Sequence, residues 1–571
     1  MPDEEHFHVV VVGSGFGGAV SAYRLAADED KDLRVLILER GQPYPPGSFP
    51  RTPRQMREAF WDPGTGRHGL YEYWRFKDLD MMCASGLGGG SLIYSNVMIP
   101  KDRDTFVKED LADGGRESWP FDREELEPHY RHVLDMQCPQ VYPATEPYAS
   151  TPKTLAFQEA SNAIGLEARR PPLAVLFAPA EGEDPVPGAP VPGGDLHGLP
   201  RSTCRLCGEC NVGCNYGAKN TLDFTYLSAA KDVGAQIRTC CEVRTIDPLG
   251  ENGGGYQVGY TQHLAARDGH PRDLVDPVAE ARRTVLADRV ILAAGAVGST
   301  RLLLMNVGAL PRLSPKLGTR VSANGDAIAM LRDASVQGPD GEIEPLYVDP
   351  SVGPVITTTI DVPEDRSPSG RGYRVQDAGA PVLADWLWEW LEVPKVPWRM
   401  RRTIVRELGT ALLNRRRETN LSRDLAEIFT DRSGRLIPLL ANGRDVPNGN
   451  YYLDGDRLEL NWSSAPSEDY YQGVETTFGH ISEALGGRLR MALWKRLNRS
   501  VTIHPLGGCP MAKDRRYGVV DPWGQAFGHP GLFVTDGSAM PGPVGANPSF
   551  TIAAFADRVA EAILEGRPGS P

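Results

Sequence analysis

Residues 8–40, HVVVVGSGFGGAVSAYRLAADEDKDLRVLILER, carry the pattern from which the architecture of this chain follows. The apolar run at 9–12 is typical of a buried parallel strand, and residues 19–26 are typical of a helix. The turn between them has the spacing Gly-x-Gly-x-x-Gly, at Gly13, Gly15 and Gly18. We expect Gly13 to form the tight turn, Gly15 to let the backbone approach a pyrophosphate, and Gly18 to let the helix pack closely on the strand.

A second apolar strand at 35–38 ends in Glu39, 21 residues after Gly18. A carboxylate at this place accepts hydrogen bonds from both ribose hydroxyls of a dinucleotide. Glu39 argues against a 2′-phosphate, although the neighbouring Arg40 weakens that argument. Because strand, glycines, helix, second strand and acid occur in this order, the sequence predicts a dinucleotide-binding unit rather than a purely structural turn.

The composition limits the other classes of function. The 571 residues, 41% of them hydrophobic, are enough for two to four domains, and the net charge of −13 argues against nucleic acid as a partner. No apolar run approaches the ~18 residues of a membrane span. Since Asp3, Glu4 and Glu5 precede a strand that begins within ten residues of Met1, we expect no signal peptide and a cytoplasmic protein.

A second glycine-rich segment, SGLGGGSL at 85–92, follows an irregular Pro-, Gly- and Arg-rich excursion at 42–69. Without Cβ atoms the backbone can pass directly against a ligand, although a flexible loop is the alternative. The β-prone residues 92–94 that follow favour an ordered segment. The candidate cofactor contacts here are Gly86, Gly88, Gly89, Gly90 and Ser91.

Four of the nine cysteines have the spacing C-x-x-C-x-x-C-x-x-x-C, at Cys204, Cys207, Cys210 and Cys214. This is the spacing of a bacterial ferredoxin loop, although Asn215 stands where such loops carry proline. In that pattern the fourth cysteine serves another cluster, so a further ligand would come from Cys138, Cys240 or Cys241. Two interpretations stay open, an iron–sulfur or other metal site and a set of buried or loop-bracing thiols.

The middle of the chain mixes helices and strands. We expect two helices within 119–165, with Gly165 just after the second, and a surface loop at 178–200, which holds six prolines and five glycines. Residues 289–304 predict a strand, a small-residue turn at 293–298 that includes Gly295, and a helix. Alternating apolar residues at 353–376 and 451–462 predict an antiparallel sheet inserted into the first architecture.

Residues 385–423 combine aromatic and basic character. Four tryptophans at 386–398 precede eight arginines at 399–423, where only Glu407 and Glu418 are acidic. Such a segment is typical of a helix at a lipid surface and predicts peripheral membrane contact. The alternative is a pair of ordinary helices with a solvated arginine face.

The C-terminal part carries candidate chemistry. His504 precedes a proline, and the short strand at 532–534 leads to Asp536 and Gly537, where a carboxylate suits a polyol hydroxyl. We expect Asn547 to cap the next helix with Pro548 at its first position. The apolar spacing along 552–563 predicts that this helix is buried. A buried helix N-terminus stabilises a nearby anion by ~1–2 kcal/mol, and a reduced flavin ring carries such a charge.

These motifs together resemble the glucose–methanol–choline family of flavin oxidoreductases, and within it the cholesterol oxidase-like branch. The resemblance rests on GSGFGG, LILERG, GLGGGS, VILAAGAVGST, HPLGGC and the segment VTDGS to ADR at 534–558. It implies bound FAD and an α/β fold, with a Rossmann-like FAD-binding domain and a substrate-binding domain whose mostly antiparallel sheet is covered by helices. We assign 1–118, 201–325 and 495–571 to the FAD-binding domain, and 119–200 and 326–494 to the substrate-binding domain.

The resemblance also implies roles for residues at the flavin. His504 and Asn547 would hold the substrate hydroxyl while its carbon gives hydride to flavin N5. The branch places a glutamate on a strand of the substrate domain, and here Gln376 stands at that place. The implied activity is oxidation of a hydrophobic alcohol, a 3β-hydroxysteroid in first place, to the ketone, with oxygen as acceptor.

Two alternatives to this activity stay open. The first is an FAD alcohol dehydrogenase that passes electrons to a dye-like or protein acceptor, through a cluster at the four cysteines if one forms. It arises because the cysteine quartet is absent from the best-known sterol oxidases. The second is a non-catalytic flavoprotein or membrane-surface module, which the intact His504 and Asn547 disfavour.

Overall fold

The computed structural model of the chain describes residues 5–110, 115–193, 195–250, 254–263, 281–337, 342–346, 348–349, 351–379, 436–491 and 499–567. The predicted surface-associated segment 385–423 lies outside the described residues. Among the described helices, none is both long enough and apolar enough to cross a membrane.

The first core is a seven-stranded sheet. Six of its strands follow the order β14-β2-β1-β17-β16-β15, and the seventh strand, β28, pairs with β17. The strands β14, β2, β1, β17 and β28 are parallel, and β15 and β16 are antiparallel to their neighbours. Their bounds are β1 His6–Val12, β2 Val35–Leu38, β14 Gln236–Arg238, β15 Cys241–Pro248, β16 Tyr256–Gln262, β17 Ala281–Leu292 and β28 Leu532–Val534.

Helices cover the parallel part of this sheet, and the predicted dinucleotide-binding unit is confirmed. α1 (Phe16–Ala26) packs on α12 (Ser549–Glu565) and α5 (Tyr226–Asp232), and α12 packs in turn on α3 (Arg123–Gln137). A Cβ atom on Gly18 would overlap the carbonyl oxygen of Gly13, so only glycine allows this approach of helix and strand. Strands buried on both faces explain the continuous apolar runs of β1 and β2.

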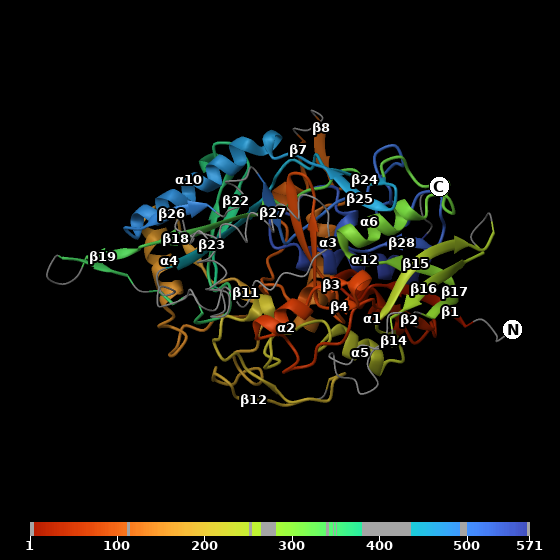
Figure 1. Ribbon diagram of the computed structural model, residues 1–571, viewed down its shortest axis with the longest axis horizontal. Coiled ribbons are helices and arrows are strands. Elements are labelled where there is room, and N and C mark those ends of the chain that lie inside the picture. Colours follow the sequence, from red (N-terminus) through yellow and green to blue (C-terminus); the bar gives the residue numbers. More distant parts are fainter. Residues whose placement is uncertain are drawn as a thin grey trace.

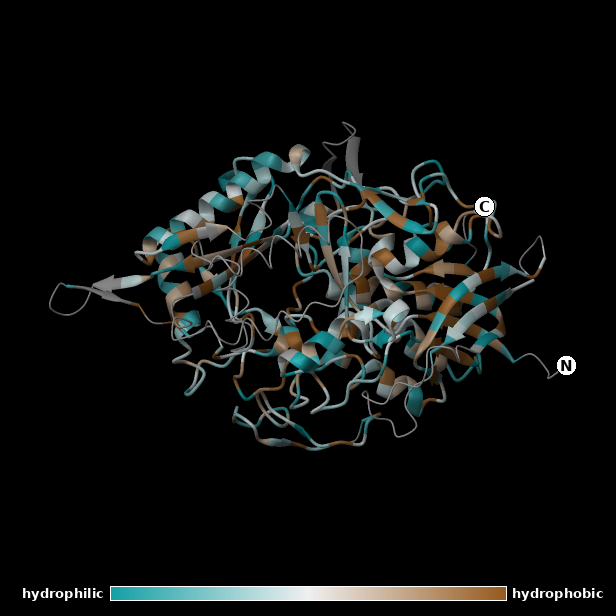
Figure 2. Ribbon diagram, viewed as in Figure 1, coloured by the Kyte–Doolittle hydropathy of each residue, from teal (hydrophilic) through white to brown (hydrophobic). Residues whose placement is uncertain are grey.

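The second core is a six-stranded antiparallel sheet at the opposite side of the molecule (Figure 1). Its order is β10-β21-β22-β23-β18-β26, with α4 (Pro152–Ala163) and α10 (Glu468–Ala484) packed on one face. Figure 2 shows mainly hydrophilic residues on the visible surface of α10, as expected for a covering helix. The strands are β10 Ala168–Arg169, β18 Ala327–Arg332, β21 Thr359–Val362, β22 Tyr373–Asp377, β23 Leu436–Gly443 and β26 Arg488–Met491.

Smaller elements connect the two cores. A three-stranded sheet of β5 (Tyr71–Arg75), β6 (Leu79–Ala84) and β27 (Ser500–Thr502) leads directly to His504. The helix α6 (Gly295–Met305) follows β17. The remaining short pairs are β3 Trp61–Asp62 with β4 Arg67–His68, β7 Val107–Asp110 with β8 Gly115–Ser118, β9 Gln140–Val141 with β11 Pro172–Leu173, β12 Pro190–Val191 with β13 Arg201–Ser202, and β19 Ser335–Gln337 with β20 Ile343–Pro345.

Three expectations on local structure were wrong in detail. The excursion at 42–69 contains a short helix, α2 (Pro53–Glu58), because Thr52 and Gln55 form a capping box at its start. The turn after β17 is shorter than predicted, since α6 already begins at Gly295. Residues 450–461 form a separate hairpin of β24 (Asn450–Asp454) and β25 (Arg457–Asn461), although their apolar face is buried as expected.

A buried ion pair ties α4 to the second sheet. Lys153 Nζ lies 2.5 Å from Asp377 Oδ2, and both side chains are fully buried. The same carboxylate accepts from the backbone of Thr357 and Thr358 at 2.8 and 2.7 Å. Removing one partner of such a pair leaves an uncompensated charge in the interior.

We therefore expect Lys153→Ala to lower the free energy of unfolding by ~3–5 kcal/mol, measured from urea unfolding. The matched control is Arg169→Ala, whose ion pair with Asp361 at 2.8 Å is exposed on both sides. That change should cost ~1 kcal/mol or less. Equal shifts of the unfolding midpoint in the two variants would contradict this account.

Candidate active site

The first part of the site forms where β1 and β2 end. Glu39 is 4% exposed, and its carboxylate accepts from Ser14 N at 2.9 Å, Ser14 Oγ at 2.6 Å and Gly41 N at 2.8 Å. The acid therefore lies against the glycine turn, as the dinucleotide pattern predicts. Its role in binding ribose stays a prediction.

The two glycine-rich segments lie against each other. A Cβ atom on Gly89 would stand 2.7 Å from Gly15 Cα, and Gly88 N donates to Ser14 Oγ at 3.0 Å. Gly88 and Gly89 both have positive φ, at 109° and 53°. The loop is ordered rather than flexible, because backbone contacts that exclude any side chain fix its path. Ser91 Oγ accepts from Leu222 N at 3.1 Å.

A third segment reaches the same end of the sheet. Gly295 N donates to the Asp536 carboxylate at 2.8 Å, and Ser538 N donates to it at 2.9 Å. Burial raises the pKa of Asp536, while Ser299 and Ser538 oppose that effect by hydrogen bonding. Gly537 follows in the turn η9 (Gly537–Ala539). The carboxyl ends of β1, β17 and β28 thus gather the predicted cofactor contacts at one edge.

Buried polar atoms without a partner test whether these residues fit FAD. Both amide atoms of Asn96, the hydroxyl of Ser85 and the hydroxyl of Thr535 are buried and have no hydrogen-bond partner among the described residues. All three residues flank predicted cofactor contacts in the sequence, and buried polar groups are normally satisfied. Glycine turns for the pyrophosphate, an acid for ribose and these free groups fit the polar parts of FAD. Asn96, which follows the second glycine cluster, was missed by the sequence analysis.

His504 is held by a buried carboxylate. Its Nδ1 lies 2.8 Å from Asp326 Oδ1, and Asp326 Oδ2 accepts from Thr502 Oγ1 at 2.7 Å and Ile503 N at 3.1 Å. A carboxylate that accepts at Nδ1 places the ring proton there, so the neutral ring keeps its lone pair on Nε2. The sequence analysis missed Asp326, since no motif marks it.

Asn547 and Gln376 face each other. Gln376 Nε2 donates to Asn547 Oδ1 at 3.1 Å, and Asn547 Nδ2 donates back to Gln376 Oε1 at 3.4 Å. Asn442 Nδ2 also donates to Gln376 Oε1, at 3.3 Å. All three side chains are buried. The predicted position of Gln376 on a strand of the second sheet therefore lies beside the predicted site residue Asn547.

Asn547 does not start the last helix as expected. α12 begins at Ser549, and Pro548 occupies the capping position without a side-chain cap, so the helix starts one residue later than predicted. The reason is that the Asn547 side chain bonds to Gln376 instead of capping the helix. The prediction that this helix start is buried is correct.

A single segment, 322–326, holds both halves of the site. Asp326 holds His504, and Asn324 donates to Ala546 O at 2.9 Å and accepts from Val544 N and Gly545 N at 3.0 and 3.1 Å. Asp445 fixes the segment itself by accepting from Ala323 N at 2.9 Å. Burial raises the pKa of Asp445 to about 7, although the hydrogen bonds that it accepts from Ser322 and Ala323 act to lower this pKa.

Three cationic side chains hold the loop before Asn547. Lys101 Nζ, fully buried, donates to Pro543 O at 3.0 Å, and Arg374 Nη1 donates to Gly545 O at 2.7 Å. Arg320 Nε donates to Pro541 O. These bonds satisfy buried carbonyl groups of a loop that has no regular secondary structure, so they fix its path.

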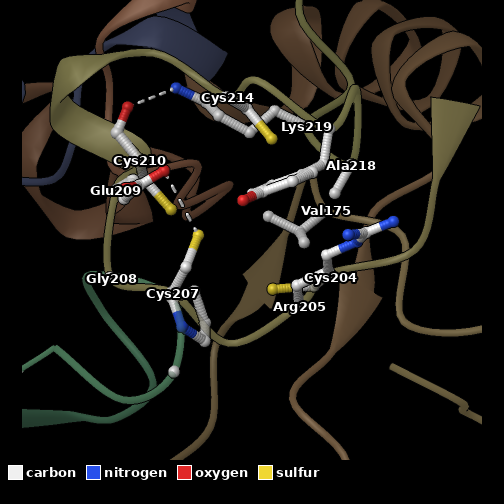
Figure 3. A pocket seen from close by; sticks show the side chains of 13 residues that line it. Val175, Cys204, Arg205, Cys207, Gly208, Glu209, Cys210, Cys214, Ala218 and Lys219 are labelled. Carbon is white, nitrogen blue, oxygen red and sulfur yellow. Dashed lines mark hydrogen bonds between the residues drawn. The ribbon is translucent and has the colours of Figure 1, made fainter. Parts of the chain in front are cut away.

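The four predicted cysteines line one cavity (Figure 3). Their sulfur atoms point toward the same space, which Arg205, Glu209 and Lys219 also border. Cys138, Cys240 and Cys241 do not line it. The expectation that one of these three would have to supply a ligand was wrong, because the short turn η4 (Cys210–Val212) folds Cys214 back to the same cavity.

Comparison with known proteins agrees with this fold. The chain matches family models described as GMC oxidoreductase at 193–322 and 463–556 and as an NAD(P)-binding Rossmann-like domain at 11–45. It is 26% identical to a cholesterol oxidase from Mycobacterium tuberculosis, with 97% of this chain and 90% of that protein covered. A long-chain-alcohol oxidase from Arabidopsis thaliana is 24% identical, with 98% and 68% covered.

A solved structure extends the comparison to the fold. Formate oxidase from Aspergillus oryzae, a protein with FAD, has a TM-score of 0.57 at 14% identity, and the match covers 99% of each chain. At this identity the likeness shows that the two proteins share a fold. The two GMC family models and the cholesterol oxidase relative support the GMC oxidoreductase family, with its cholesterol oxidase-like members, for this chain, which is an FAD-dependent alcohol oxidoreductase.

If Glu39 binds the ribose of FAD, Glu39→Gln should weaken FAD binding. Hydrogen bonds to a charged group contribute ~1.5–3 kcal/mol, which is roughly 10- to 100-fold in Kd. The measurement is the Kd for FAD of deflavinated protein by fluorescence titration. Asp288→Asn, on an exposed acid that pairs with His6 at the edge of the same sheet, is the control. An unchanged Kd in Glu39→Gln would overturn the assignment.

Proposed function

We propose that this protein oxidises a hydrophobic alcohol, a sterol in first place, to the corresponding ketone or aldehyde. The observation that carries the proposal is that one buried segment, 322–326, holds His504 through Asp326 and the loop before Asn547 through Asn324. A proton acceptor and an amide donor are thereby fixed relative to each other. This is the pair of groups that removal of hydride from an alcohol carbon requires.

His504 is proposed as the proton acceptor. Asp326 orients the ring and compensates the positive charge that the ring gains on taking the hydroxyl proton at Nε2. Since Asp326 is itself held by Thr502 Oγ1 and Ile503 N, the ring cannot turn without breaking a buried network. Asp326 acts through His504 and is a positioning residue.

Asn547 is proposed as the donor to the substrate oxygen. Its Oδ1 accepts from Gln376 Nε2 and its Nδ2 donates one N–H to Gln376 Oε1, which leaves the second N–H of the amide for the alcohol oxygen. Gly13, Gly15, Gly18, Glu39 and the segment 86–91 would hold FAD, which would supply the hydride acceptor. The protein's own contribution is to orient the alcohol, take its proton and balance charge on its oxygen.

The substrate class is supported by the relatives. A cholesterol oxidase and a long-chain-alcohol oxidase, two proteins named for bulky apolar alcohols, align over nearly the whole of this chain. We propose oxygen as the acceptor in the oxidase form of this reaction. The four-cysteine cavity favours a second candidate, a dehydrogenase that passes electrons to another acceptor.

An assay with cholesterol and a long-chain primary alcohol tests the proposal, with hydrogen peroxide and dye reduction followed in parallel. His504→Ala and Asn547→Ala should each lower turnover about 10²- to 10⁴-fold while bound FAD is retained. His480→Ala, on the exposed face of α10, is the matched control and should keep full turnover. Full turnover in either site variant would refute that residue's assignment, and no oxidation of either alcohol by FAD-loaded protein would refute the substrate class.

Gln376 generates a prediction about the product. Sterol oxidases of the cholesterol oxidase-like branch, which this chain resembles, can move the 5,6 double bond into conjugation after oxidation. This shift requires a base that takes a proton from carbon and returns it. A glutamine amide does not titrate near neutral pH. Asp377 cannot replace it, because its side chain lies on the opposite face of β22 and is paired with Lys153.

We therefore expect a 5-ene sterol to yield the unconjugated ketone, without the ultraviolet absorbance of an enone above the solution background. Gln376→Glu should increase the rate of enone formation. The control is Gln376→Ala, which should leave enone formation at the background. Rapid enone production by the natural protein that survives Gln376→Ala would mean that another residue is the base.

A further inference from the structure

The cavity lined by Cys204, Cys207, Cys210 and Cys214 is built for a ligand. All four cysteines are free thiols, and Cys204 and Cys210 are buried. The loop is fixed by close backbone contacts, since a Cβ atom on Gly208 would stand 2.7 Å from the carbonyl oxygen of Ser351. Gly208 N also donates to Gly353 O at 2.9 Å. Figure 3 shows the four sulfur atoms around one space instead of dispersed in a core.

The spacing of the sulfur atoms distinguishes between ligands. A tetrahedral zinc ion with Zn–S bonds of ~2.3 Å would bring its thiolates to about 3.8 Å from one another. Among the described residues, the only three metal-binding side chains with ligand atoms within 4.8 Å of one another are His129, His132 and Asp557, so no three of these sulfurs are that close. A cuboidal cluster carries its thiolates on separate irons, which places them farther apart than around a single ion.

The thiols are not suited to disulfide exchange or nucleophilic catalysis. Burial of Cys204 and the Glu209 carboxylate that lies 3.7 Å from Cys207 Sγ both disfavour a free thiolate. Reactive cysteines have the opposite property, a thiolate stabilised near neutral pH. Binding to iron displaces the proton, because the thiolate is the ligand. Leu206 N already donates to Cys204 Sγ at 3.4 Å, the kind of N–H···S contact that stabilises a ligating thiolate.

A buried ammonium group borders the cavity, while the Glu209 carboxylate at the same cavity is already paired with Arg51 at 2.9 Å. Lys219, 1% exposed, donates through Nζ to three carbonyl oxygens, those of Leu92, Tyr94 and Cys210, at 3.1, 2.9 and 3.0 Å. A buried ammonium group without an opposite charge is costly. A cluster with four thiolates carries net negative charge and compensates this ammonium.

The same lysine connects the cavity to the flavin-binding segment. Two of its three acceptors, Leu92 and Tyr94, directly follow the second glycine cluster. Ser95 Oγ donates to Asn211 Oδ1 at 3.0 Å, and η4 contacts η2 (Gly89–Leu92). The cysteine loop and the predicted cofactor contacts are therefore parts of one packed unit.

We propose that Cys204, Cys207, Cys210 and Cys214 bind one iron–sulfur cluster of the four-iron type, which passes electrons from the flavin to an external one-electron acceptor. This electron path, although not the cluster itself, rests on the second candidate of the proposed function, a dehydrogenase that passes electrons to an acceptor other than oxygen. Each alcohol oxidised to a carbonyl releases two electrons and two protons. The protons pass to water, and the electrons leave singly, so each carbonyl formed reduces two molecules of a one-electron acceptor.

The test uses the full protein purified without oxygen. Protein with the cluster should contain about four iron atoms and four acid-labile sulfides per chain and, after reduction with dithionite, give a paramagnetic resonance signal at low temperature. Cys207→Ser and Cys214→Ser should each lose iron, sulfide and signal while the flavin spectrum reports a folded protein. The control is Cys138→Ser, on an exposed thiol outside the cavity, which should change none of these.

The electron path has a separate readout. Natural protein should reduce ferricyanide with two equivalents per carbonyl formed, and Cys207→Ser should lower this rate at least tenfold. Two results would overturn the cluster. One is protein that stays free of iron after incubation with ferrous iron and sulfide, and the other is protein that contains one zinc ion per chain and no sulfide. A cluster in protein that oxidises no alcohol would refute the proposed function alone. An undiminished ferricyanide rate in cluster-free Cys207→Ser would refute the electron path alone.

Discussion

The close approach of three backbone segments, the turn at Gly13 and Gly15, the loop at Gly89 and the end of β17 at Ala293, is the constraint on which the site depends. No side chain fits between Gly13 and Gly18, or between Gly89 and Gly15, so the turn after β1 and the segment before η2 can meet only through glycine. The end of β17 is fixed in the same way, since a Cβ atom on Gly13 would overlap the carbonyl of Ala293. Segments nearly 300 residues apart thereby converge on one edge.

A second, polar constraint joins this edge to the antiparallel sheet. The segment 322–326 precedes β18 and carries two buried side chains that bond in different directions, Asn324 toward the loop before Asn547 and Asp326 toward His504. Buried polar groups of this kind are costly when unsatisfied, so each bond restricts the geometry of the other. The placement of His504 and of the loop before Asn547 is thus a property of the junction between the two cores.

The sequence was sufficient for the elements with strong local signals. The pattern of 8–40 predicted β1, α1, β2 and Glu39 because glycine sterics and an apolar period act within short distances along the chain. Gln376 was located only through a family resemblance, and its contact with Asn547 agrees with that placement. Asp326 was not found, because its partner His504 lies 178 positions away and nothing near Asp326 in the sequence marks that contact. Asn96 was not found, because the sequence does not show that its amide has no partner among the described residues.

The cysteine loop shows a further limit of prediction from sequence. Its spacing suggested a metal site, but the spacing alone assigned the fourth cysteine to a different cluster, and only the fold of 210–214 returns Cys214 to the same cavity. The buried Lys219 could not be identified from sequence either, because its significance lies in three carbonyl partners from two separate segments.

The amide at Gln376 follows from what Asn547 needs. Asn547 Oδ1 is buried and must accept a hydrogen bond, and Gln376 Nε2 supplies the donor at 3.1 Å. A glutamate at 376 in its ionised form offers two acceptors and no donor, so Asn547 Oδ1 would lose its partner, while the bond that Asn547 Nδ2 already donates to residue 376 would be kept and strengthened by the charge. Glutamine at 376 thus satisfies both polar atoms of the Asn547 amide at once, which a carboxylate at the same place cannot do.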